Sequence, residues 1–188
     1  MLESKFKNFN HLKIHTQYSI CEGAIKIDDL KEYSKENKVK SLAICDTSNL
    51  CGALEFAEKI SKVGTQPIIG TQINFKFGDT IGLLPLFAMN ETGYKRIIEL
   101  SSLSYLDNEG FLEPHIPFEE LYKMNEGVIL FSGTVFGLFG KLFDKGKFLE
   151  IDELYSNLKS KFKDRFYIEI QRHNDQNELS FEKFNLQK

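Results

Sequence analysis

The sequence lacks the features that would place it among secreted or membrane proteins. Its only cysteines are Cys21, Cys45 and Cys51, an odd number without C-x-x-C spacing. This usage argues against a disulfide framework or a zinc knuckle and predicts a reducing compartment. No apolar run approaches the roughly 18 residues that span a bilayer, and no early segment resembles a signal peptide. We therefore expect a cytoplasmic protein that does not contact membranes.

The chain also lacks an excess of positive charge. It has 24 lysines and arginines against 27 aspartates and glutamates, a formal net charge of -3. This balance gives no general attraction to nucleic acid, so we expect DNA contacts only through other domains of a larger protein. What is present is ordinary: 188 residues, 41% of them hydrophobic and 27% charged, which allow one domain with a large core.

Strand-like and helix-like patterns alternate along the chain. After a polar lead-in at 1–8, strands are predicted near 10–16, 41–45, 67–75, 83–89, 128–131 and 165–171. Helices are predicted at 27–37, 50–63, 94–105, 118–124 and 151–162, with a short helix after Thr134, turns at 19–23 and 78–79, and a loop at 107–117. Repeated βα units predict an α/β fold, and polar residues at several strand ends favour a barrel over an open sheet. Because barrels need roughly 250 residues, we expect a fragment that stops before its last strands.

Alternating residues at 10–16 place His11, Lys13 and His15 on one face of the first predicted strand. Two histidines at such spacing can bind one divalent ion, but the middle position is a lysine, whose charged ammonium cannot be a ligand. The pattern therefore looks like a metal site that has lost a ligand.

Six collinear blocks resemble one protein family. The longest are residues 11–23 (HLKIHTQYSICEG) and 41–53 (SLAICDTSNLCGA), followed by 67–70 (PIIG), 90–94 (NETGY), 125–133 (NEGVILFSG) and 164–170 (DRFYIEI). Together they resemble the PHP (polymerase and histidinol phosphatase) domain that begins bacterial DNA polymerase III alpha subunits. The resemblance implies a distorted, TIM-like βα barrel over residues 9–188, with the polymerase domains in later sequence and the cleft at the strand C-termini.

Active PHP domains bind about three divalent ions through histidines and carboxylates, which activate water and hold phosphate oxygens. The resemblance places the cleft positions of this chain at Lys13, His15, Glu22, Asp46, Thr47, Gln72, Leu83 and Thr134. Apart from Asp46, only His15 and Glu22 keep ligating residue types at these positions, because lysine, threonine, glutamine and leucine replace the others. We therefore expect these positions to be vestigial and the chain to contain no catalytic, cofactor-binding or metal-binding residue.

Two of these positions have competing interpretations. Lys13 either takes over the charge of the lost ion by neutralising Glu22 and Asp46, or is an ordinary lysine at a strand end. Asp46 is either a remnant base or a cap of the helix predicted at 50–63, and the second interpretation is the default. Gly133, Gly137 and Gly140 could form a phosphate cradle, but tight packing explains them better.

The resemblance implies the function as well. The chain is expected to be a metal-free structural region of the replicative DNA polymerase, in contact with the proofreading exonuclease subunit and with the rest of the holoenzyme. Mg²⁺ would serve only the full polymerase. The alternative is an enzyme that needs Zn²⁺ or Mn²⁺, either a PHP phosphoesterase or an intrinsic 3'-5' proofreading exonuclease.

Overall fold

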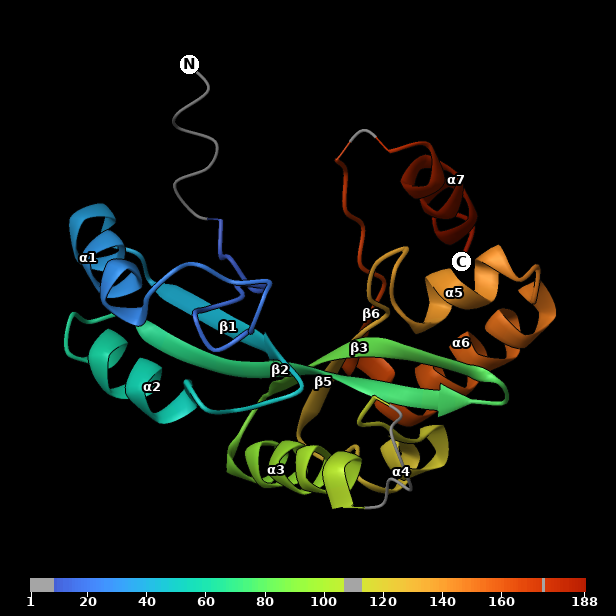
Figure 1. The fold of residues 1–188 in the computed structure, drawn as a ribbon, viewed down its shortest axis with the longest axis horizontal. Helices are drawn as coiled ribbons and strands as arrows, with labels where there is room; N and C mark the ends of the chain where they lie inside the picture. The colour runs from blue at the N-terminus through green and yellow to red at the C-terminus, as the bar shows by residue number, and fades with distance from the viewer. Residues whose placement is uncertain (1–8, 107–112, 174) are drawn as a thin grey trace. The chain divides into compact units, whose positions relative to one another are not determined.

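The computed structural model describes residues 9–106, 113–173 and 175–188, which form two compact units divided between Gln72 and Ile73 (Figure 1). The predicted lead-in at 1–8 and most of the loop predicted from residue 107 lie outside the described residues. The expectation that 9–188 form one PHP domain stays a prediction. No helix within the described ranges is long and apolar enough to cross a membrane.

The first unit is built on two parallel strands with two helices. It contains α1 (Ile27–Asn37), β1 (Ser41–Thr47), α2 (Ala53–Ser61) and the first part of β2 (Gln66–Phe77). The register of β1 and β2 runs from Ser41 opposite Gln66 to Thr47 opposite Gln72. Both helices pack against the strands through buried apolar side chains, namely Ile27, Leu30, Leu42, Ile44, Phe56 and Ile60. The prediction of α1 is confirmed at both ends, whereas α2 is shorter than the predicted 50–63.

Residues 10–16 do not form the predicted strand. The segment is irregular, and only Thr16 makes an isolated bridge, to Ile25. It still lies beside β1, because Ala43 N donates to His11 O at 3.0 Å and Cys45 N donates to Ile14 O at 2.8 Å. Donors two residues apart on β1 therefore meet acceptors three residues apart on the segment. This mismatch, like that of a β-bulge, prevents a regular ladder.

The second unit contains the rest of β2 and most of the helices. Its remaining elements are β3 (Thr80–Ala88), α3 (Glu91–Leu106), β4 (Ile116–Pro117), α4 (Phe118–Lys123), β5 (Val128–Phe131), α5 (Leu138–Asp144), α6 (Phe148–Phe162), a 3-10 turn (Lys163–Arg165), β6 (Phe166–Tyr167) and α7 (Gln176–Asn185). The prediction of β5 is confirmed at both ends. The last predicted strand, 165–171, shrinks to two residues, and the short strand β4 lies where a loop was predicted.

The sheet of the second unit is mixed. Its strands hydrogen-bond in the order β2-β3-β5-β6, and β4 pairs with β2. The contacts of β4 with β2 and of β6 with β5 are parallel, but β3 and β5 are antiparallel. The predicted turn at 78–79 is confirmed and reverses the chain between β2 and β3. The chain is therefore a mixed α/β protein, and the complete or truncated barrel stays a prediction.

Helix α7 packs against α5 and α6 through aromatic side chains. Phe143 of α5 lies 5.4 Å from Phe181 and 5.3 Å from Phe184, measured between ring centres. The hydroxyl of the buried Tyr155 in α6 donates to Asn185 Oδ1 at 3.0 Å. The apolar residues near the end of the sequence thus form a helix that covers part of the core of this unit.

The three glycines after β5 are needed for close packing. A methyl group on Gly140 would lie 1.9 Å from the carbonyl oxygen of Val135, and one on Gly137 would lie 2.8 Å from that of Leu83. Gly133 has a φ of +77°, which favours glycine. The prediction of tight packing at these glycines is confirmed.

Lysines at the end of α5 and just after it hold the turn between β2 and β3. Lys147 Nζ lies 2.8 Å from Asp79 Oδ1 and Lys145 Nζ lies 2.8 Å from Thr80 Oγ1, while Lys141 Nζ donates to the carbonyl of Ile81 at 2.9 Å. The hydrogen bond from Lys147 is the main reason why the pKa of Asp79 falls from 3.8 to about 2. A lowered carboxyl pKa means that the folded state favours the ionised form.

We predict that Asp79→Asn slightly lowers the melting temperature at pH 7, because it removes an exposed ion pair. The difference between variant and parent should persist above pH 3.8, the ordinary pKa, and shrink as the pH falls toward about 2, where the parent carboxyl also becomes neutral. Thermal unfolding between pH 2 and 7 measures both curves. A difference that does not change with pH would contradict this interpretation.

Candidate functional site

Asp46 at the end of β1 anchors the segment that carries the predicted cleft residues. Its side chain is 1% exposed. It accepts hydrogen bonds from Thr16 N at 2.6 Å, Thr16 Oγ1 at 2.8 Å and Ser19 Oγ at 2.7 Å. The predicted helix cap is therefore wrong, because α2 begins after Gly52 without any side-chain cap. The carboxylate instead satisfies donors of a segment about thirty residues earlier.

The turn after Thr16 follows from this anchor. Ser19 is buried, and its hydroxyl also accepts a hydrogen bond from Thr47 N at 3.1 Å. The backbone N–H groups of Glu22 and Gly23 both donate to Ser19 O. A methyl group on Gly23 would lie 2.0 Å from Thr16 O, so glycine is required where the turn returns past Thr16. The predicted turn at 19–23 is confirmed.

Three of the predicted cleft residues are joined by hydrogen bonds. Thr47 Oγ1 donates to Glu22 Oε2, and Gln72 Nε2 donates to Thr47 Oγ1 at 2.7 Å. We call Glu22, Thr47 and Gln72 the polar clasp. It connects the turn to the C-terminal end of β1 and to the neighbouring position of β2.

His15 lies at the edge of the polar clasp. Its Nδ1 is 3.9 Å from Glu22 Oε2, beyond hydrogen-bond distance. This nitrogen is buried and has no hydrogen-bond partner among the described residues. The structure thus brings His15 close to Glu22 without joining the two.

Lys13 and the three remaining histidines, His11, His115 and His173, have separate surroundings. Lys13 is half-buried in the irregular segment beside β1, and its role in charge replacement stays a prediction. His11 is exposed, and its ring lies 5.0 Å from that of Phe9. His115 Nδ1 is 2.8 Å from the carbonyl of Glu113, and the exposed His173 pairs with Glu178 at 2.7 Å.

A second network, which the sequence did not reveal, ties the same turn to both helices of the first unit. The hydroxyl of Tyr18 donates to Glu55 in α2 at 2.6 Å, and Lys59 bridges Glu55 at 2.8 Å and Asp28 in α1 at 2.6 Å. The hydrogen bond to Glu55 raises the pKa of Tyr18, and the two carboxylates, Asp28 foremost, raise the pKa of Lys59 to about 12. The turn is therefore fixed from its outer side as well. The i, i+4 spacing of Glu55 and Lys59 was the only sequence signal of this network.

Leu83 and Thr134 belong to the second unit, where Leu83 in β3 lies beside the loop that contains Thr134. The carbonyl of Leu83 faces Gly133 and Gly137, as the close approaches of the two glycines indicate. Thr134 Oγ1 accepts a hydrogen bond from Phe136 N at 3.2 Å. Leu83 offers no side-chain donor to a metal, and the hydroxyl of Thr134 serves its own loop.

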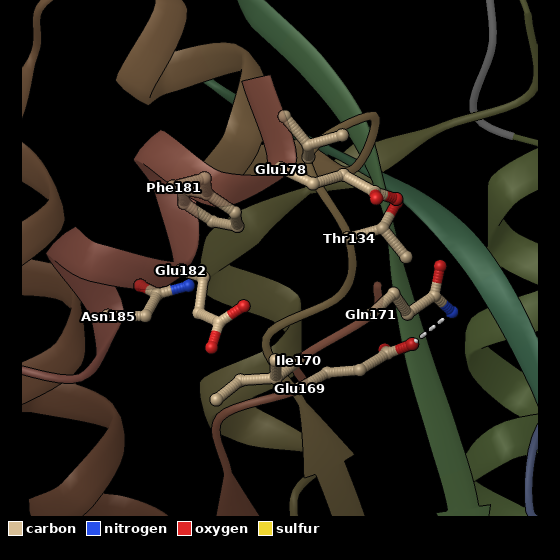
Figure 2. Close-up of a pocket in the computed structure, with 9 residues that line it drawn as sticks. Thr134, Glu169, Ile170, Gln171, Glu178, Phe181, Glu182 and Asn185 are labelled. Atoms are coloured by element: carbon tan, nitrogen blue, oxygen red, sulfur yellow. Dashed lines mark hydrogen bonds between the residues drawn. The ribbon is translucent and has the colours of Figure 1, made fainter. Parts of the chain in front are cut away.

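Thr134 also lines a small pocket of the second unit (Figure 2). Its volume is about 10 Å³, room for roughly one water molecule. The residues around it are Thr134, Val135, Glu169, Ile170, Gln171, Glu178, Phe181, Glu182 and Asn185.

The acidic residues of this pocket are largely engaged in contacts with neighbouring side chains. Glu178 accepts hydrogen bonds from His173 and Glu182 pairs with Arg172, and these contacts lower the pKa of both carboxyls. Gln171 Nε2 donates to Glu169 Oε1 at 2.8 Å, the dashed line in Figure 2. The sequence did not point to this pocket because its acids come from a short irregular segment and from a helix beyond it.

The donor set of the cleft residues does not match a cluster of divalent ions. The hydroxyl of Thr47 and the amide of Gln72 are neutral and hydrogen-bonded to each other. The carboxylate of Glu22 already accepts a hydrogen bond from the hydroxyl of Thr47. Such clusters need several anionic or imidazole ligands. Within the described ranges, no three His, Cys, Asp or Glu side chains are grouped as a metal site.

Comparison with known proteins gives consistent matches over nearly all of the sequence. The chain is 38% identical over 181 residues to the DNA polymerase III subunit alpha of Caulobacter vibrioides, which covers 92% of this chain and 16% of that protein. It is 32% identical over 176 residues to the same subunit of Escherichia coli, covering 92% of this chain and 15% of that protein. The chain thus spans about a sixth of the length of these relatives.

Solved structures give only a remote similarity. An amidohydrolase from Chromobacterium violaceum aligns with a TM-score of 0.39 and 15% identity, covering 48% of this chain and 32% of that one. The family comparison is decisive instead, because the model of the PHP domain matches residues 11–173. This chain is a member of the PHP domain family.

Proposed function

We propose that the chain is the N-terminal PHP region of a cytoplasmic replicative DNA polymerase III alpha subunit. The similarity to alpha subunits over 92% of the chain supports this assignment. DNA synthesis, with its Mg²⁺ requirement, would then belong to domains beyond the part that aligns here. DNA would reach the protein through those domains, in keeping with the net charge of -3.

Within that subunit, we propose a structural role for a PHP fold of the barrel type that works without bound metal. The polar clasp carries this proposal, because residues at family ligand positions bond to one another instead of presenting free donors. A cleft with this chemistry keeps fewer anionic and imidazole ligands than a metal cluster that activates water requires. The region would support the polymerase domains and offer a surface to the proofreading exonuclease subunit.

The alternative is a phosphoesterase or an intrinsic 3'-5' proofreading exonuclease that depends on Zn²⁺ or Mn²⁺. The retained His15 and Glu22, 3.9 Å apart, favour it. Two such ligands can hold one ion only weakly, and a further ion would need ligands from other residues.

We predict that the chelator-stripped full chain binds no stoichiometric Zn²⁺ or Mn²⁺ and does not hydrolyse phosphoesters. Calorimetric titration and metal analysis after dialysis measure the first property, and release of phosphate from a chromogenic diester measures the second. His15→Ala is the matched control for surface-bound ions. Tight uptake of two or three ions, lost in this variant, would establish the enzymatic alternative.

Lys13→Ala tests whether the ammonium replaces the charge of an ion. If it neutralises Glu22 and Asp46, the variant should melt about 2–4 °C lower, the shift that roughly 1 kcal/mol produces in a domain of this size. Lys40→Ala, at an exposed position of the same unit, is the control. Equal melting temperatures for parent and Lys13→Ala at all pH values would leave Lys13 as an ordinary lysine.

Binding of the exonuclease subunit tests the partner. The full-length polymerase should form a complex with the purified exonuclease subunit in size-exclusion chromatography, and deletion of residues 1–188 should abolish it. Primer extension by the deleted protein controls for correct folding of the remaining domains. A complex that survives the deletion while extension is intact would place the docking surface elsewhere.

A further inference from the structure

The polar clasp has a definite hydrogen-bond direction. An ionised carboxylate only accepts hydrogen bonds, so the single hydroxyl proton of Thr47 must point to Glu22. Thr47 can then only accept from position 72, and the amide of Gln72 supplies the proton through Nε2. The direction from Gln72 through Thr47 to Glu22 follows from the chemistry of the three groups.

The burial of Gln72 and the backbone contacts around it restrict which side chain position 72 can hold. Gln72 is 6% exposed, so a charge there would be largely removed from water. The backbone holds the pair in place, because Thr47 and Gln72 are register partners and Ser48 N donates to Gln72 O at 2.8 Å. The two side chains therefore start from neighbouring backbone positions at the ends of the two strands.

We infer that Thr47 and Gln72 are a matched pair. The residue at position 72 must be a neutral hydrogen-bond donor, because the hydroxyl of Thr47 already donates its only proton to Glu22. This inference deepens the proposed function, since it rests on a cleft that holds no ion. A carboxylate at position 72 would face a hydroxyl without a second proton and would add a negative charge beside Glu22. Besides Asp46, whose oxygens are occupied by Thr16 and Ser19, the polar clasp thus accommodates one carboxylate, which either position 22 or position 72 can carry.

A reciprocal exchange tests the pairing. Gln72→Glu should melt lower than Gln72→Leu by about 2–4 °C, because it adds repulsion to the lost hydrogen bond. Glu22→Gln alone should change the melting temperature little, since the amide oxygen can still accept from Thr47. The double variant Glu22→Gln/Gln72→Glu should regain most of the loss of Gln72→Glu, because the amide at position 22 now donates to Thr47 and Thr47 donates to the carboxylate at position 72.

Thermal unfolding of the full chain in EDTA compares the parent with the four variants, and hydrogen exchange of residues 17–23 reports on the turn itself. Recovery in the double variant supports the matched pair, even if Gln72→Glu alone does not fold. Additive losses in the double variant, or failure of both to fold, would overturn it. A metal requirement of the parent would show separately, as a loss of parent stability in EDTA that Mn²⁺ reverses, and would contradict the proposed function instead.

Discussion

The buried carboxylate of Asp46 is the constraint on which the first unit depends. It is the next-to-last residue of a strand that is buried from Leu42 to Asp46. A carboxylate at that depth needs hydrogen-bond donors, and leaving it without them would cost about 1–3 kcal/mol or more. Thr16 and Ser19 provide these donors. The turn must therefore cross the end of β1.

The position of the turn determines what the neighbouring residues can do. The hydroxyl of Ser19 also accepts a hydrogen bond from the backbone N–H of Thr47. Glu22 then lies within hydrogen-bond distance of the hydroxyl of Thr47. Tyr18 fixes the opposite side of the turn through Glu55. The carboxylates of Asp46 and Glu22 are thus held by neutral hydroxyl and amide donors of the turn and the strand ends.

The sequence predicted local structure well where the boundaries of an element follow from its own residues. Helix α1 and strand β5 match the predictions at both ends, 27–37 and 128–131. The apolar residues Ile27 and Leu30 of α1 and Val128 and Leu130 of β5 are buried. The segment at 10–16 shows the limit of such patterns. Its alternation is genuine, but its contacts with β1 are spaced three residues against two. That mismatch arises only when the segment and β1 lie side by side, so it cannot be predicted from the sequence of either one alone.

The same limit explains the site. Asp46 precedes residues that are common helix caps, and only a partner thirty positions earlier changes its role. The family resemblance predicted which ligand positions had changed residue type, because that information is local. It could not predict that Thr47 and Gln72 hydrogen-bond to each other. That contact requires the register in which Thr47 lies opposite Gln72. A slip of one residue would turn the side chain of Gln72 to the other face of the sheet. The residue types at positions 47 and 72 can therefore be read from the sequence, whereas the hydrogen bond between them depends on the register of two strands.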